Sequence, residues 1–370
     1  MNVVYKKLED VCEILDSRRV PITAKDRKAG DYPYYGANGL QDYVADYIFD
    51  DELVLLAEDG GNFGSKERPI AYRVSGKCWV NNHAHVLKAK PNMHVDYLCY
   101  ALMFYDTEGL VNGATRQKLT QAAMRQMVIP YRDMTEQLQI IKKISQIVRS
   151  IEKRKEELQL LDQLVKSRFI ELFGDPMTDV SKWSASTIGE QFNVASGGTP
   201  ATGEKVYWEN GTIPWIGSNM CQDTILSEND GKFITEEGYA HSSAKWFHKG
   251  TVLVALVGAT IGKTALLRFD TTTNQNIAAI DVTQNAAFSS EFVFYHMQML
   301  YSKFMEIGSG KFKMANQGFI RQLPLICPPI ELQQQFAAFV EQTDKSKLAV
   351  QKGLQELEIL KKSLMQQYFG

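Results

Sequence analysis

Several short motifs in this 370-residue chain look like parts of enzyme active sites. The segment Gly258–Thr264 (GATIGKT) is similar to a nucleotide-binding phosphate loop, which has four residues between its glycines where this segment has three. Ala265–Phe269, directly after it, indicates a strand, whereas a phosphate loop opens a helix. The corresponding point in the first half, Gly60–Lys66 (GGNFGSK), is also rich in glycine. We therefore predict a hairpin turn of the scaffold at both places and no nucleotide site.

The sequence also lacks complete motifs for methyl transfer, metal binding and acyl transfer. Asp31–Tyr34 (DYPY) lacks the first proline of the D/N-P-P-Y/F motif of amino-methyltransferases, and no glycine-rich S-adenosylmethionine loop precedes it, so it indicates a strand. The histidines form no HExxH motif and have no cysteine partners at metal spacing. His83 and His85 alternate along a predicted strand, where we expect a surface or groove rather than a metal site. Ser218 and Ser309 lie in no G-x-S-x-G elbow. We predict no catalytic, cofactor-binding or metal-ligating residue.

What remains is recognition chemistry, because amide, hydroxyl and basic side chains gather at the predicted turns. Amides can pair with adenine through two hydrogen bonds, arginine or lysine can pair with guanine, and lysines hold phosphates. The alternative interpretation is that polar residues populate the turns of every protein. The predicted DNA-contacting residues are Arg18, Arg19, Lys66, Arg68, Asn81, Asn82, Arg116, Lys118, Arg125, Ser218, Asn219, Lys245, Lys263, Asn274, Gln275, Lys311, Lys313, Gln317 and Arg321.

Two of the turns share a pattern. Gly113–Gln126 and Gly308–Gln322 each contain a basic loop tip followed by Gln-x-x-x-Arg-Gln in the same register. Because the tips differ while the following residues persist, we expect the tips to contact different targets and the shared residues to seat them. For Arg125 and Arg321 two roles stay open, a bond to backbone carbonyls and a contact with phosphate.

The shared pattern belongs to a longer repeat. Residues 114–174 align without a gap onto residues 310–370, with fifteen identities where random pairing would give roughly four. The period is too long for a solenoid, whose repeats run at roughly 20–50 residues. The chain is therefore a duplicated domain with an internal pseudo-two-fold relation.

Each copy begins with a β-rich half. Short β-branched and aromatic runs separated by Gly, Asn and Pro are typical of a mostly β domain with long turns. Compact helices are predicted near Val95–Tyr105 and Phe288–Met305.

Each copy ends in a long helix. Met134–Phe173 contains no Gly or Pro, predicts a helix roughly 60 Å long, and stops at Gly174. The second helix has a weaker apolar seam, with Lys347 and Lys361 on it and Gly353 costing about 1 kcal/mol in mid-helix. Each helix alone would expose its stripe, so we expect the two to pack together. The predicted helix–helix packing residues are Ile144, Val148, Ile151, Leu158, Leu161, Val165, Val340, Leu354, Leu357 and Leu364.

Bulk composition does not reveal the function. The chain has 44% hydrophobic residues, a mean hydropathy of −0.25 and a net charge of −2. That charge speaks weakly against nucleic acid as a partner, since such domains are often basic. There is no apolar run long enough to cross a membrane and no signal peptide, and the five cysteines are scattered. We expect a cytoplasmic protein with no membrane partner.

The order of these features resembles the specificity subunit of type I restriction-modification systems. The resemblance rests on two β-rich halves of unequal sequence, each followed by a long helix ending in K-S-x-x-x-x-x-F-G, and on the series SGGTP, IPWIGSNM, GTVLVALVGATIGKTALL, NQNIAAI and PPIELQQQF in the second half. It covers essentially the whole chain. SRRVP at Ser17–Pro21 departs from SGGTP at Ser196–Pro200, and the seam of the second helix is broken.

The resemblance implies an α+β fold with two target recognition domains and two helices packed as an antiparallel coiled coil. The implied boundaries are 1–133 and 175–329 for the recognition domains, with 134–174 and 330–370 for the spacer helices. The implied partners are double-stranded DNA read as a split target, two adenine methyltransferase subunits, and restriction and translocase subunits. S-adenosylmethionine, ATP and Mg²⁺ would act on those partners, and this chain would be non-catalytic. Two alternatives stay open, a coiled-coil adaptor with two protein-binding heads and a free-standing DNA methyltransferase.

Overall fold

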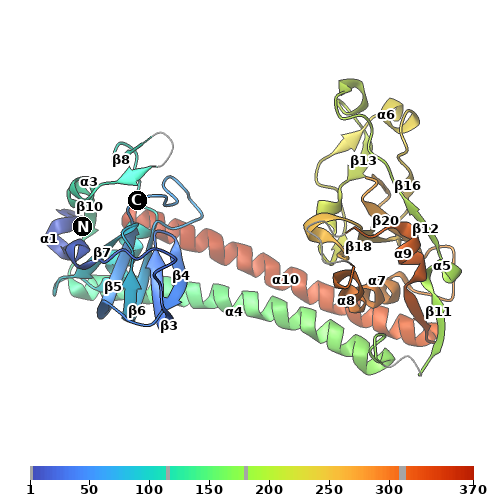
Figure 1. The fold of residues 1–370 in the computed structure, drawn as a ribbon, viewed down its shortest axis with the longest axis horizontal. Helices are drawn as coiled ribbons and strands as arrows, with labels where there is room; N and C mark the ends of the chain where they lie inside the picture. The colour runs from blue at the N-terminus through green and yellow to red at the C-terminus, as the bar shows by residue number, and fades with distance from the viewer. Residues whose placement is uncertain (1–2, 114–116, 179–181, 308–313) are drawn as a thin grey trace. The chain divides into compact units, whose positions relative to one another are not determined.

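The computed structural model describes residues 3–113, 117–178, 182–307 and 314–370 (Figure 1). The chain forms two compact units, residues 1–155 together with 351–370, and residues 156–350. Each unit holds one β-rich head and part of both long helices. Within the described ranges, no helix combines the length and the apolar character needed to cross a membrane.

The first unit is built on a six-stranded sheet. Its strands, in spatial order, are β2 (Cys12–Ile14), β7 (Ala84–Ala89), β5 (Phe49–Ala57), β6 (Ala71–Val80), β3 (Ala29–Gly36) and β4 (Gly39–Val44). The neighbouring strands are antiparallel except for β3 and β6. The smaller elements are β1 (Val4–Lys7) paired with β10 (Val128–Tyr131), β8 (Val111–Asn112) paired with β9 (Lys118–Leu119), α1 (Leu8–Val11), η1 (Asp16–Arg18), α2 (Val95–Met103) and α3 (Gln121–Gln126).

Strand β5 lies in the middle of this sheet and is buried on both faces. Val54 and Leu56 pack with α2, whereas Leu53 and Leu55 pack on the opposite face. Successive side chains of a strand point to opposite faces, so an unbroken apolar run such as Leu53–Ala57 marks a strand covered on both sides. Helix α2 confirms the compact helix predicted near Val95–Tyr105.

The second unit divides its strands between two sheets. The five-stranded sheet has the order β12 (Asn193–Ser196), β20 (Ile277–Asp281), β17 (Val252–Ala255), β18 (Thr264–Leu267) and β14 (Thr224–Leu226). The four-stranded sheet has the order β15 (Phe233–Ile234), β13 (Ile213–Ile216), β19 (Thr271–Thr273) and β16 (Trp246–Phe247). The smaller elements are β11 (Ser184–Thr187) paired with β21 (Pro324–Cys327), α5 (Ile188–Gln191), η2 (Lys205–Tyr207), η3 (Ser218–Met220), α6 (Glu236–Ala240), η4 (Gly258–Thr260), α7 (Ser290–Met299), α8 (Tyr301–Met305) and α9 (Gln317–Gln322). The helix predicted near Phe288–Met305 is present as α7 and α8, which meet at Leu300.

The four-stranded sheet explains why SGGTP and SRRVP differ. A side chain at Gly197 would collide with the carbonyl of Thr273 in β19, and one at Gly198 would collide with the backbone at Ser243–Ala244, beside β16. In the first head, the strands corresponding to β18 and β19 are one continuous strand, β6. Arg18 and Arg19 therefore occupy positions that require glycine in the second head.

The two long helices are α4 (Met134–Phe173) and α10 (Ile330–Phe369), as predicted. Helix α4 stops at Gly174, which has a left-handed φ of +81°. Both helices run unbroken past the interruptions seen in the sequence, including Gly353.

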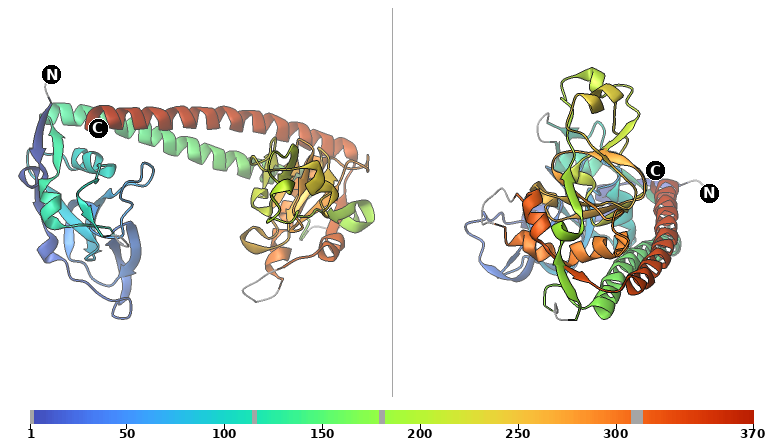
Figure 2. Two further views of the ribbon diagram at one scale, coloured as in Figure 1. Left: turned by 90° about the horizontal axis from the view of Figure 1, so that it is seen from above. Right: turned by 90° about the vertical axis from the view of Figure 1, so that its right-hand side faces the viewer.

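Within each unit the beginning of one long helix lies beside the end of the other (Figure 2). In the second unit, Phe169 and Phe173 of α4 contact Phe336 of α10, with ring centroids 5.5 and 5.6 Å apart. In the first unit, Met365 of α10 shares a core with Ile140 and Ile144 of α4. Phe369 also packs edge-on against Tyr97 of α2 at 5.0 Å. The aromatic end of α4 therefore completes the core of the second head. The aromatic end of α10 completes the core of the first head.

Burial of the predicted packing residues varies along the helices. Ile144, Ile151, Val165 and Val340 are buried, and Val148, Leu158, Leu161, Leu354, Leu357 and Leu364 are half-buried. Lys347, on the predicted seam, is only 17% exposed because its ammonium lies 2.7 Å from the Asp162 carboxylate of α4 and 3.5 Å from Asp344. An ion pair between the helices therefore satisfies the charge that interrupts the apolar stripe.

Candidate nucleic-acid interface

Both heads fasten the return of the loop tip by the same backbone contacts. The Leu119 N–H donates to the Glu58 carbonyl at 2.7 Å, and the Ala315 N–H donates to the Leu256 carbonyl at 2.9 Å. Isolated bridges join Asp59 to Lys118 and Val257 to Met314. Residues 118–119 and 314–315 are equivalent in the sequence repeat. We call this place, where the tip returns to the turn after the central strand, the return node.

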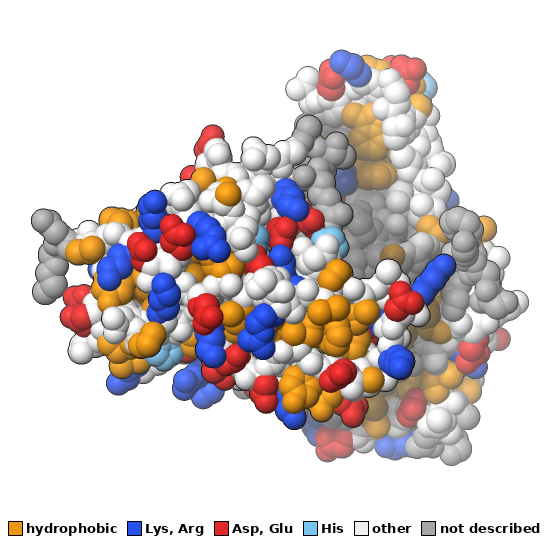
Figure 3. Space-filling model, turned by 60° about the vertical axis from the view of Figure 1, so that its left-hand side comes forward, with side chains coloured by type: hydrophobic (Ala, Val, Ile, Leu, Met, Phe, Trp, Pro, Cys, Tyr) orange, Lys and Arg blue, Asp and Glu red, His pale blue; other side chains and the backbone are white. Residues whose placement is uncertain are grey.

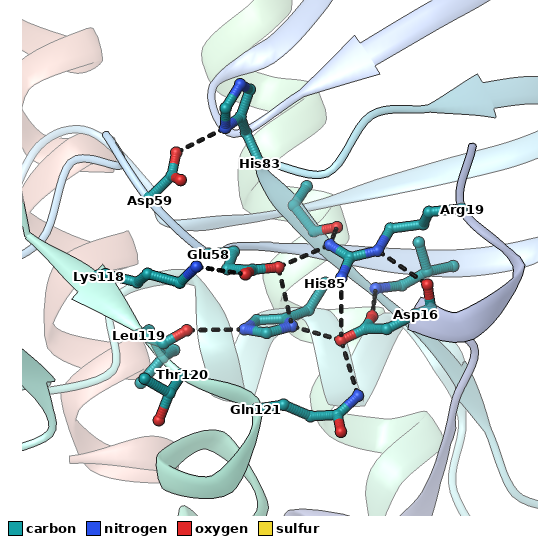
Figure 4. Close-up of polar contacts among 12 residues, drawn as sticks. Asp16, Arg19, Glu58, Asp59, His83, His85, Lys118, Leu119, Thr120 and Gln121 are labelled. Atoms are coloured by element: carbon teal, nitrogen blue, oxygen red, sulfur yellow. Dashed lines mark hydrogen bonds and ion pairs between the residues drawn. The ribbon is translucent and has the colours of Figure 1, made fainter. Parts of the chain in front are cut away.

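In the first head, an ionic cluster of Asp16, Arg19, Glu58, His85 and Lys118 surrounds the return node (Figure 4). The Arg19 guanidinium lies 2.7 Å from Glu58 and 3.6 Å from Asp16, and it donates to the Ala84 carbonyl at 2.7 Å. The Lys118 ammonium lies 3.1 Å from Glu58. The Asp16 and Glu58 side chains are only 5% and 13% exposed, whereas that of Lys118 is 50% exposed. The cluster therefore runs from the interior to the rim of the tip.

His85 is the buried centre of this cluster. Its Nδ1 lies 2.6 Å from Asp16 Oδ2, and its Nε2 lies 2.9 Å from the Leu119 carbonyl. Burial alone would raise the pKa of Asp16, but the hydrogen bond and charge of His85, with help from Val86 N–H and Arg19, hold that pKa below its usual value. For Glu58, burial is likewise outweighed by Arg19 and Lys118, and its pKa is also lowered. Both carboxylates are therefore stabilised as anions.

Asp16, Glu58 and His85 also meet a geometric requirement for a metal site. Each offers one ligand atom, and these atoms lie within 4.8 Å of one another. However, Arg19 and Lys118 already contact the carboxylates and supply the positive charge that a metal ion would bring. The residues fit a closed ion-pair cluster better than a metal centre.

The other predicted residues of the first head divide into exposed and internally used side chains. Lys66, Arg68 and Asn82 are exposed. Arg18 donates to the Ile48 carbonyl, and the side chain of Asn81 accepts the His83 N–H at 2.8 Å. Arg116 lies outside the described residues. Arg18 is exposed as well, so Arg18, Lys66, Arg68 and Asn82 are the side chains of this group most accessible to a ligand.

The second head shows the same division. Asn219, Lys245 and Gln275 are exposed, and Ser218 is half-buried. The Lys263 ammonium lies 2.5 Å from Asp223, and Asn274 accepts the Asn276 N–H at 3.1 Å, as Asn81 does in the first head. Gln275 accepts from the Thr199 hydroxyl at 2.6 Å. Lys311 and Lys313 lie outside the described residues.

The shared Gln and Arg residues after the tips connect α3 and α9 to their heads. Gln121 donates to Asp16 at 3.1 Å, and Gln317 contacts the Val194 carbonyl and the Ser196 hydroxyl and N–H. Arg321 donates to the Val194 carbonyl at 2.7 Å, whereas Arg125 lies 3.4 Å from Glu9 and is 40% exposed. These contacts give both arginines an intramolecular partner, and their contact with phosphate stays a prediction.

Sequence reasoning missed Gln137 and Gln333, which join each long helix to its head. Gln137 accepts the His94 N–H and donates to the carbonyls of Asn92 and Arg132, at 2.8 to 3.0 Å. Gln333 accepts the Ser289 N–H and donates to the carbonyls of Ala287 and Pro328 over the same distances. His94 and Ser289 are the N-caps of α2 and α7. The identity of the two glutamines in the repeat was the available signal.

The structure also decides several interpretations of motifs. GATIGKT forms η4 and the turn into β18, which pairs with β17 as a hairpin, and DYPY lies in β3, both as predicted. The surface position expected for His85 is wrong, because its side chain is 1% exposed. His83 is 36% exposed and lies 2.7 Å from Asp59. His83 and His85 were expected on one exposed face of the strand, but η1 and the tip return cover this face where His85 lies.

Basic and acidic side chains are interspersed over the face of the molecule drawn in Figure 3. That mixture agrees with the net charge of −2. A duplex bound there would rely on individual basic residues rather than on an extended positive surface.

Comparison with known proteins identifies relatives over most of the chain. The family described as type I restriction modification DNA specificity domain matches residues 2–161 and 180–359. A type I restriction enzyme specificity subunit of Haemophilus influenzae is 37% identical over 38% of this chain and 36% of its own length. The EcoR124I/EcoR124II specificity subunit of Escherichia coli is 25% identical over 64% of this chain and 57% of its own length.

Solved structures share the fold over the full chain. The S subunit of a type I restriction-modification system from M. genitalium has a TM-score of 0.59 at 15% identity, covering 100% of this chain and 96% of that one. A structure from work on complex assembly and conformational transition of the type I R-M system also has a TM-score of 0.59 at 15% identity, covering 100% and 99%. At this identity the likeness concerns the fold.

Proposed function

The chain belongs to the type I restriction-modification DNA specificity family, and we propose that it reads a two-part DNA target through its two heads. The observation that carries this proposal is the pair of return nodes. Their backbone contacts are the same, while the tips and the side chains around them differ. A common support with divergent contact residues is what a protein needs to read two different half-sites.

We further propose that α4 and α10 pack antiparallel along their length as a coiled-coil spacer between the half-sites. Contacts between the start of each helix and the end of the other support this arrangement. Exposed apolar side chains on these helices, including Leu160, Leu164, Leu348 and Ile359, offer area for partner subunits. The partners we propose are two adenine methyltransferase subunits, which flip the target base, and restriction and translocase subunits.

In this proposal the chain supplies recognition and the partners supply catalysis. S-adenosylmethionine, ATP and Mg²⁺ would bind to the partners. The chain is nearly neutral, so the methyltransferases that close round the duplex would contribute much of the charge that neutralises its phosphates.

Methylome sequencing of a host with and without this chain tests the proposal. We expect adenine methylation at one two-part sequence to disappear with the chain. Unchanged methylation would contradict a role in target choice. Methyl transfer to DNA by the purified chain alone would instead identify a free-standing methyltransferase.

Exchange of a single head tests the two-part reading. Replacing residues 1–133 with the corresponding head of a relative should change one half of the methylated sequence and keep the other. The same exchange of residues 175–329 is the matched control and should change the opposite half. If either exchange altered both halves, the heads would not read independently.

A further inference from the structure

The return nodes of the two heads have the same backbone and opposite side-chain chemistry. Four residues of the ionic cluster in the first head align with uncharged residues in the second. The aligned pairs are Arg19 with Gly198, Glu58 with Leu256, His85 with Ala278, and Lys118 with Met314. Leu15 aligns with Ala195 and Ser17 with Ser196, so Asp16 has no counterpart in the second head. Leu256, Ala278 and Ala315 lie in the apolar core of the second head. The tip return is therefore held by charges in one head and by apolar packing in the other.

The contacts of His85 indicate that both of its ring nitrogens carry a proton. The Leu119 carbonyl beside Nε2 can only accept a hydrogen bond, and the Asp16 carboxylate beside Nδ1 is also an acceptor when ionised. A neutral imidazole has one N–H and can satisfy only one of them. The doubly protonated ring donates to both, and the Glu58 carboxylate at 3.7 Å adds a second favourable charge.

Each element packed against His85 contributes to this arrangement. η1 and the residue after it bring Asp16 and Arg19, the turn after β5 brings Glu58, β9 brings Lys118 and the Leu119 carbonyl, and α3 brings the neutral Gln121. Arg19 bridges the two carboxylates, and Lys118 contacts Glu58 at the rim. The imidazolium thus links the interior carboxylate Asp16 directly to the tip return.

Building on the proposed function, we propose that His85 in its protonated form is the positioning residue for the tip of the first head. When the ring is neutral, the remaining proton stays on Nδ1 beside the Asp16 carboxylate, and the Nε2 lone pair then faces the Leu119 carbonyl. The return of the tip thereby loses its hydrogen bond to the cluster. Reading of the first half-site therefore weakens as pH rises. Reading of the second half-site, which has Ala278 at this position, does not respond in this way.

Selection from a random duplex pool tests this inference on the full chain assembled with its methyltransferase subunits. The measurement is the preference for the best base over the others, scored separately in each half of the enriched sequence. Selections are run from about pH 6 to about pH 9. The variant is His85→Gln, which carries no imidazolium. The control is Lys88→Gln on the same strand, which breaks an exposed ion pair with Asp51 away from the cluster.

We expect His85→Gln to reduce preference in the first half by roughly tenfold or more, the factor for one lost charge-assisted hydrogen bond, and to leave the second half unchanged. In the unmodified chain, first-half preference should fall relative to second-half preference as pH rises, and Lys88→Gln should behave the same way. Unchanged first-half preference in His85→Gln, a pH-independent ratio in the unmodified chain, or an equal loss in both halves would overturn the inference. An unmodified chain that enriches no two-part sequence would instead overturn the proposed function.

Discussion

Gln137 and Gln333 make equivalent hydrogen bonds in the two heads, so replacing either one should lower the free energy of unfolding. Gln333 is fully buried and satisfies the Ser289 N–H and the carbonyls of Ala287 and Pro328. Gln333→Ala leaves these groups without a partner, so we expect the free energy of unfolding to fall by about 3 kcal/mol. The measurement is urea unfolding. Gln335→Ala, an exposed glutamine two residues along the same helix, is the control and should change it by less than about 0.5 kcal/mol. Equal effects of the two changes would contradict the anchoring role.

His296 predicts how the second unit responds to acid. Its side chain is buried between Phe169 and Phe292, its Nδ1 has no partner, and burial lowers its pKa to about 3. The unfolded chain therefore binds a proton near pH 6.5 that the folded chain refuses, and stability is lost as pH falls below that value, by up to about 1.4 kcal/mol per pH unit. His296→Gln removes this proton site. We expect the difference in Tm between the variant and the unmodified chain to move in favour of the variant from about pH 6.5 to about pH 4. A difference that stays constant with pH would show that His296 is not the responsible group.

The sequence indicates which residues are shared between the two copies, but not which of them are buried or which partners they contact. Gln137 and Gln139 are equally conserved between the copies, yet Gln137 is buried and Gln139 is exposed, because only one of them faces the head. Arg19, a predicted DNA contact, is 13% exposed, and its guanidinium lies 3.6 Å from Asp16, three residues earlier, and 2.7 Å from Glu58, which is distant in the sequence. Such roles depend on contacts between segments that no local pattern records.

Helix α10 contains Gly353, a residue that disfavours helical structure. Gly353 is helical, and an added Cβ would meet nothing within 4 Å. Gly353→Ala should therefore stabilise the first unit by about 1 kcal/mol, because alanine loses less conformational freedom in a helix. Thermal unfolding checks this expectation. Gly198→Ala is the control and should destabilise the second head, since its Cβ would meet the backbone at Ser243–Ala244. A lower Tm for Gly353→Ala would indicate that the glycine is needed for close packing.

The long helices were the most predictable elements, and the division of the β-rich heads was the least. A period of three to four residues over forty positions, ended by Gly174, specifies a helix with little competition. The two sheets of the second head were not foreseen, since β15, β16 and β19 have only two or three residues each. Strands this short show no periodic pattern in the sequence, and whether they form depends on pairing with strands distant in the sequence.

For the whole molecule, the boundaries between the two units mark where the proposed spacer can be lengthened. They fall inside the helices, after Lys155 in α4 and after Val350 in α10. Seven residues inserted at each boundary add about 10.5 Å and nearly preserve the facing sides of the helices. We expect the gap between the two half-sites to grow by about three base pairs, with both half-sites unchanged. Four residues inserted at each boundary are the control, because they rotate each helix by about 40° relative to its seam and should lower Tm. Methylome sequencing measures the gap, and an unchanged gap after the seven-residue insertion would exclude the helices as the ruler.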